Sequence, residues 1–117
     1  GALTWLDVAG VLIETGDAPG AERVLRAGLA KVPIAEESGQ QLAVMLAMLL
    51  TASERKPDAE KLRDTLAQKI TDPTTKAAFI KAFDAAVAGA EAEMKNIQAE
   101  DAEAQTAPAA PSQGTTK

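Results

Sequence analysis

The hydrophobic pattern of the chain centres on one stretch, Leu42 to Leu50, in which nine consecutive positions are apolar. Val44 is the only β-branched residue in it, which favours a helix over a strand. Ser38 and Gln41 precede the stretch at the spacing of a capping box, in which each side chain bonds to the free backbone N–H of the other residue. Because a helix that is apolar on every side has to be covered, we predict that other helices surround this one.

Helical periodicity also marks the segments on either side of this stretch. The Gly16–Pro19 segment breaks the first periodic run, Asp17 can cap the second, and Pro33 ends it. Asp72 and Pro73 form a helix start, a cap followed by a proline at the first helical position. Since the connection between the first two segments is short, they should form an antiparallel hairpin. The predicted helices span residues of about 4–15, 18–31, 39–53, 57–70 and 73–98.

The first two segments carry large and small residues at a regular spacing. These positions hold Trp5, Val8, Ala9, Leu12, Gly16, Ala21, Leu25, Gly28 and Pro33. The pattern resembles the tetratricopeptide repeat, a pair of antiparallel helices in about 34 residues. The departures from the family keep the character of each site: Val and Ala replace Leu and Gly on the first helix, and Leu replaces both aromatic residues. In such a repeat the small residues let neighbouring backbones approach closely, and the large ones fill the gaps.

A degenerate copy of the pattern follows about 38 residues later, with Ala59 at the position of Ala21. Leu46, Ala47 and Leu50 then correspond to positions of the first copy, whereas the aromatic positions and the turn glycine are absent. The resemblance therefore implies an all-α, short right-handed α-solenoid of about two antiparallel helix pairs. The last helix would close the array with one polar face, as terminal repeats of such arrays do.

Composition and charge narrow the classes of function. The chain has 117 residues, enough for one domain, and its formal charge of −5 argues against nucleic acid, whose phosphates need a basic face. The chain has no cysteine and no histidine, so it lacks the commonest general base and the commonest metal ligand. It also contains no glycine-rich phosphate loop. We therefore expect no catalytic residue, no metal site and no cofactor.

The two ends of the chain bear on its compartment and its boundaries. No apolar run reaches the roughly 18 residues that cross a bilayer, so we expect a soluble protein without membrane insertion. The sequence starts at Gly1 and not at a methionine, and the compartment stays open between cytoplasm and periplasm. From residue 100 to 117 the chain is rich in Ala, Pro, Ser and Thr without periodicity, and we predict a disordered tail after a helical domain of residues 1–99.

The resemblance also implies a binding surface, because ligands of tetratricopeptide proteins lie along the first helices of the pairs. Carried over by position, this concave groove consists of Leu3, Leu6, Gly10, Ile13, Gln41, Val44, Met45 and Met48. The family's chaperone-binding members hold carboxylates there with Lys, Arg and Asn, whereas Leu6 and Gly10 occupy those positions here. An apolar groove with methionine suits an apolar or amphipathic segment of a partner protein. We therefore expect a non-catalytic interaction module with a scaffold or small chaperone-like role.

Two alternatives stay open at this point. The face from Phe79 to Val87 can fill the groove itself, in which case Met45 and Met48 belong to the core, as apolar stripes at helical spacing usually do. The chain can also be a structural or oligomerisation domain from the C-terminal end of a larger protein, without a peptide ligand. In that case the partner is a second copy or the rest of the parent protein.

Overall fold

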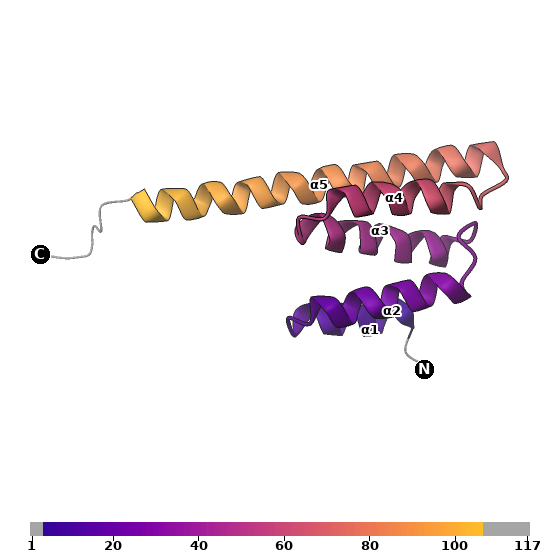
Figure 1. Ribbon diagram of the computed structural model, residues 1–117, viewed down its shortest axis with the longest axis horizontal. Coiled ribbons are helices and arrows are strands. Elements are labelled where there is room, and N and C mark those ends of the chain that lie inside the picture. Colours follow the sequence, from indigo (N-terminus) through magenta and orange to yellow (C-terminus); the bar gives the residue numbers. More distant parts are fainter. Residues whose placement is uncertain (1–3, 107–117) are drawn as a thin grey trace, which may run out of the picture.

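The computed structural model describes residues 4–106, which form five α-helices. They are α1 (Trp5–Glu14), α2 (Ala18–Lys31), α3 (Glu37–Ala52), α4 (Lys56–Ala67) and α5 (Pro73–Thr106). Consecutive helices run in opposite directions and pack against one another (Figure 1). The predicted all-α class is confirmed. Leu3 and residues 107–117 lie outside the described residues, so the predictions for them stay predictions.

The side-chain caps predicted for α2 and α5 are present. The carboxylate of Asp17 accepts a hydrogen bond from the backbone N–H of Gly20 at 3.0 Å, and the helix carries a proline in its first turn. The carboxylate of Asp72 accepts from both the backbone N–H and the hydroxyl of Thr75, at 2.8 and 2.7 Å. These two bonds favour the charged form and lower the pKa of Asp72.

The capping box predicted for α3 is wrong. The cap residue of α3 is Glu36, which makes no side-chain capping bond. The carbonyl oxygen of Glu36 accepts a hydrogen bond from the backbone N–H of Gln40 at 3.0 Å, so that Ser38 already lies inside the first helical turn. The helix therefore begins two residues before residue 39, the predicted start.

The first turn of α3 packs against the backbone of the preceding loop at Gly39. This glycine is buried, and a Cβ atom there would collide with the carbonyl oxygen of Pro33 and stand 3.0 Å from the Cα of Ile34. Ile34 itself is buried in the core. The sequence motif did not single out this close approach, which lies between a loop and a helix start and not between two helices.

Two helix ends also differ from the prediction. The helix α4 ends at Ala67, before residue 70, because Ile70 leaves the helical path and buries its side chain in the core. The helix α5 continues to Thr106, past the predicted end at residue 98, and extends beyond the other four helices (Figure 1). The predicted boundary between helical domain and tail at residues 99–100 therefore falls inside α5.

The two helix pairs have turns of the same geometry. Positions related by 38 residues are Leu12 and Leu50, Gly16 and Glu54, and Asp17 and Arg55. In each turn the last of these residues donates its backbone N–H to the carbonyl oxygen of the first, at 2.7 and 2.8 Å. The middle residue has a positive φ, 85° at Gly16 and 61° at Glu54. The second turn thus keeps the left-handed conformation although a glutamate stands where the first has glycine.

The core lies around α3, which packs against each of the other four helices. The rings of Phe79 and Phe83 on α5 meet edge to face, 5.7 Å apart, and both are buried. The central position of α3 is thereby confirmed. Its predicted cover on every side is not, because 41% of Met48 is exposed. In the described part of the chain, α1 and α5 both contact α3 but not each other, so a strip of α3 between them stays uncovered.

Candidate functional site

The uncovered strip of α3 forms the floor of a groove between α1 and α5. The groove encloses about 410 Å³ and is lined by Leu6, Glu37, Gln40, Gln41, Val44, Met45, Met48 and Ala82. Its residues on α3 recur three or four positions apart, which places them on one side of that helix. The groove is apolar along most of its length and becomes polar at the start of α3, where Glu37 and the two glutamines stand.

The structure brings most of the predicted groove residues together. Leu6 from α1 faces the same groove as Gln41, Val44, Met45 and Met48 from α3. Local helical spacing was a sufficient signal for these positions, because it decides which residues share a face of a helix. Three lining residues were missed: Glu37, Gln40 and Ala82. The helical spacing of Glu37 and Gln40 from Gln41 and Val44 could have found the first two, whereas nothing in the sequence tells which residue of α5 comes next to α3.

Two predicted residues lie on the same face of α1 as Leu6 but outside the groove lining. Gly10 is half-buried, and no atom stands within 4 Å of the position that a Cβ would take there. Ile13 is 41% exposed. These residues extend the apolar surface of α1 beyond the groove. Leu3, the remaining predicted residue, lies outside the residues that the structure describes.

The α5 helix closes one side of α3 and leaves the groove open. Phe79, Phe83 and Val87 are all buried, and they belong to the same core cluster as Leu46 and Leu50 of α3. If this face of α5 filled the groove, both methionines would be buried. Instead, Met48 keeps 41% of its surface exposed, and Met45 is half-buried. The large side chains of α5 therefore seal the core, and Ala82, which is small, borders the groove.

The charges on the two main helices of the groove have one sign. The helix α1 carries Asp7 and Glu14, the helix α3 carries Glu37, and neither helix contains a lysine or arginine. Glu37 accepts a hydrogen bond from the side-chain amide of Gln41 at 3.4 Å. Asp7 accepts one from the backbone N–H of Thr4 at 3.2 Å. Among the described ion pairs, none involves a residue of α1 or α3.

The opposite surface, formed by α2, α4 and the turn before α4, contains paired charges. Arg55 in that turn bonds to Glu22 of α2 at 2.7 Å, and Arg26 bonds to the same carboxylate at 3.0 Å. The hydrogen bond from Arg55 is the main cause that lowers the pKa of Glu22, and partial burial opposes it. Arg63 of α4 bonds to Asp84 of α5 at 2.9 Å. These pairs tie neighbouring helices together.

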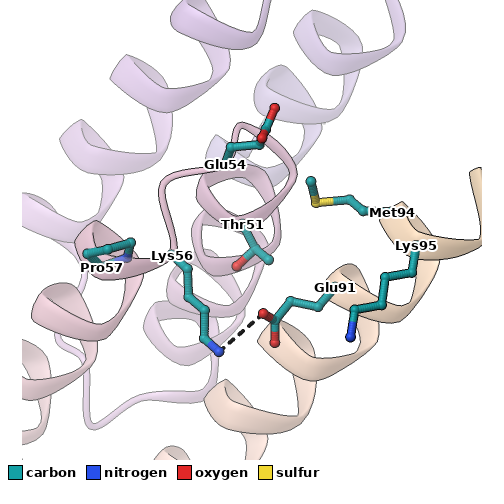
Figure 2. A pocket seen from close by; sticks show the side chains of 7 residues that line it. All are labelled: Thr51, Glu54, Lys56, Pro57, Glu91, Met94 and Lys95. Carbon is teal, nitrogen blue, oxygen red and sulfur yellow. Dashed lines mark ion pairs between the residues drawn. The ribbon is translucent and has the colours of Figure 1, made fainter. Parts of the chain in front are cut away.

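A second hollow lies where α5 passes the turn between α3 and α4 (Figure 2). It encloses about 250 Å³ and is lined by Thr51, Glu54, Lys56, Pro57, Glu91, Met94 and Lys95. Lys56 and Glu91 point toward each other across it and form an ion pair of 3.1 Å (Figure 2). The buried hydroxyl of Thr51 donates to the carbonyl oxygen of Ala47 at 2.8 Å. Lys56, Glu91 and Thr51 are thus engaged within the fold, and the Lys56–Glu91 pair connects α4 to α5 across the hollow.

Among the side chains that the structure describes, those of residues 4–97, no three potential metal-ligating groups of His, Cys, Asp or Glu gather at one place. No helix within residues 4–106 combines the length and apolar character needed to span a membrane. The carboxylates whose pKa is lowered, Glu22 and Asp72, have surface partners that account for the change.

No protein-family model, no curated protein and no solved structure matches the chain.

Proposed function

We propose that the chain is a non-catalytic interaction module, a short right-handed solenoid of the tetratricopeptide type, which binds an apolar or amphipathic segment of a partner protein. The observation that carries this proposal is the uncovered apolar strip of α3 between α1 and α5. Contiguous exposed apolar surface on a small domain is commonly a binding site. A scaffold or a small chaperone would use such a groove to hold its partner.

Two features support the resemblance to tetratricopeptide repeats. The turns of the two helix pairs repeat the same hydrogen bond and the same left-handed residue at an interval of 38 positions, between Asp17 and Arg55 for example. The small motif residues Ala9, Ala21 and Gly28 are buried. The motif suggests that the backbone of a neighbouring helix approaches Gly28. Side chains lie there instead, because a Cβ at Gly28 would meet those of Trp5 and Leu42 at 2.9 and 3.0 Å.

The dimensions of the groove suit a short helix. Its lining on α3 runs from Glu37 to Met48, which corresponds to roughly 17 Å along a helix axis at 1.5 Å per residue. A bound helix of about three turns would cover this length. Helices bound in such grooves present apolar residues three and four positions apart, and methionine side chains adapt to their shapes.

A peptide titration tests this function. A fluorescent helical peptide of about 14 residues would carry Leu and Ala on one face and uncharged polar residues on the other. We expect it to bind the wild-type chain, and we expect Met48→Glu to abolish binding, because the new carboxylate would have to be desolvated under the peptide. Val11→Glu is the matched control, since Val11 is 57% exposed on α1 and does not line the groove.

Fluorescence anisotropy gives the affinities, and circular dichroism shows whether both variants keep their helices. Equal binding by Met48→Glu and the wild type would contradict the groove as the binding site.

The alternative, a structural or oligomerisation domain, is favoured by one observation. Ile97 of α5 is 54% exposed, and the C-terminal part of that helix extends past the other four helices (Figure 1). Pairing of two such helices would bury it. Sedimentation velocity of the wild type and of Ile97→Asp decides between the two functions: a concentration-dependent dimer that is lost in the variant would support oligomerisation.

A further inference from the structure

We propose that the segment held in the groove is a positively charged amphipathic helix of a partner protein. The inference rests on the proposed function, because it presupposes that the groove binds a helix. It adds that the ligand carries positive charge on either side of its apolar face.

The helices that form the groove present carboxylates without neighbouring cations of their own. Glu37 lines the groove at the start of α3, and Glu14 stands one residue after the exposed Ile13 at the end of α1. The lysines and arginines of the described residues lie on α2, α4, α5 and the loops. The α5 wall of the groove is Ala82, so the neighbouring Lys81 does not line it. Glu14 lies beyond the lining, so a bound helix would meet the carboxylate of Glu37 at the start of α3 and no cation among the residues that line the groove.

The backbone of α1 and α3 adds partial negative charge where these two helices end. The helices α1 and α3 run in the same direction and end on the same side of the molecule (Figure 1). Their last turns contain no basic residue that would offset the partial negative charge of the terminal carbonyl groups. At the other end, Asp7 and Glu37 lie in the first turns of their helices and offset the positive ends. The helix ends therefore add no positive charge that would favour an anionic ligand.

Segments of this chain fit the groove poorly. From residue 91 to 103 the sequence has five carboxylates and one lysine, Lys95, and Glu91 is already paired with Lys56, so the corresponding segment of a second copy would bring net negative charge to the groove. Residues 107–117 contain no Leu, Ile, Val, Met or aromatic residue that could fill an apolar groove. A separate partner with a basic amphipathic segment is the occupant that complements both the apolar floor and the acidic surroundings.

Two matched peptides test the charge of the ligand. Both carry the same Leu and Ala face over about 14 residues, one with Lys and the other with Glu at every polar position. We expect the Lys peptide to bind the wild-type chain at least about tenfold more tightly, the effect of two or three exposed ion pairs. We also expect this ratio to shrink in high salt, because mobile ions screen exposed charges. Fluorescence anisotropy measures both affinities in low and high salt.

Charge variants of the groove connect the preference to its residues. Glu37→Lys and Glu14→Lys should each reduce the preference for the Lys peptide, and the double variant should reduce it further. Glu60→Lys is the matched control, because Glu60 is also an exposed glutamate but lies on α4, away from α1 and α3 and outside the groove lining. It should leave the preference nearly unchanged. Circular dichroism of each variant verifies that the helices are retained.

The outcomes separate this inference from the proposed function. If both peptides bind equally well and Met48→Glu abolishes binding of both, the groove binds helices but the inferred charge is wrong. Tighter binding of the Glu peptide would overturn the charge in the same way. If neither these peptides nor the uncharged one binds, the proposed function fails together with the inference.

Discussion

The helices α1 and α3, which form the groove, and the helices α2 and α4 are of similar length but differ in how their surfaces are used. The helices α2 and α4 take part in ion pairs such as Glu22–Arg55 and Arg63–Asp84, which connect them to neighbouring elements. The helices α1 and α3 present apolar side chains and acidic residues, and neither contains a lysine or arginine. Ion pairs therefore join α2 and α4 to the rest of the fold, whereas none of the described ion pairs involves α1 or α3.

This difference originates in the cover of α3. The buried residues of that helix, including Leu42 and Leu46, face the other helices, and Met48 faces the gap between α1 and α5. A surface that serves only stability would be expected to close such a gap with a large apolar side chain. Here the α5 side contributes the small Ala82 and the α1 side contributes Leu6, and the groove between them stays open. The comparison suggests that the fold is stabilised mainly away from the groove.

The largest predicted effect contrasts the two sides of α3. Leu46→Glu should unfold the protein, with a loss of about 4 kcal/mol or more, because Leu46 has no exposed surface and the variant buries a charge. Met48→Glu, two positions away, should change the stability by no more than about 1 kcal/mol, since its carboxylate stays hydrated. Thermal melts followed by circular dichroism measure both. Equal destabilisation by the two substitutions would mean that the groove is closed in solution.

The next contrast uses two glycines. Gly39→Ala should lower the free energy of unfolding by about 1–3 kcal/mol, because the added Cβ collides with the backbone at Pro33. Gly10→Ala should raise it by up to about 1 kcal/mol, since the space is empty and alanine is the better helix former. Urea denaturation gives both changes, whose signs should be opposite. A lower free energy of unfolding in Gly10→Ala would show that other atoms lie closer to this face of α1 than they do in the structure.

A smaller effect on the free energy of unfolding is expected on α2. Glu22→Gln should lower the stability at pH 7 by about 1 kcal/mol, because the charged hydrogen bonds to Arg55 and Arg26 are weakened. The pKa of Glu22 is lowered in the folded state, so its stabilisation is present above the unfolded pKa of about 4.3 and is lost as the pH falls through the folded pKa. Urea denaturation at a series of pH values should show the wild type and the variant converging in acid. A difference in unfolding free energy between the two proteins that stays constant from neutral to acid pH would contradict the lowered pKa of Glu22.

The smallest effect is predicted at the rim of the groove. Glu37→Gln should change the free energy of unfolding by about 0.5 kcal/mol or less, because this exposed carboxylate has one weak side-chain partner, Gln41, and a favourable helix-end position. The same variant should weaken binding of the basic peptide. Thermal melts and anisotropy on one preparation measure both quantities. A large loss of stability would make Glu37 a structural residue and remove it from the binding surface.

Much of the local structure could be predicted because its causes are local. Helical periodicity and the breaks at Gly16 and Pro33 located the helices, and the caps at Asp17 and Asp72 were predicted from a single carboxylate followed by a proline. The end of α5 could not be located in this way. Residues 100–106 have the composition of a tail, yet they continue a helix whose earlier turns are already formed.

The sequence alone determined that the chain is all-α, which residues share a face of each helix, and that α1 and α3 carry only acidic charge. These properties depend on the residue types and on the 3.6-residue period of the helix. Only the tertiary structure decided which apolar face is covered. Met45 and Met48 are apolar like Leu46, yet Met48 is exposed and Met45 is only half-buried, because α5 packs its large side chains on one side of α3 while α1 stays apart from α5. Burial depends on which residues are neighbours in space, and the short-range pattern of the sequence does not specify these neighbours.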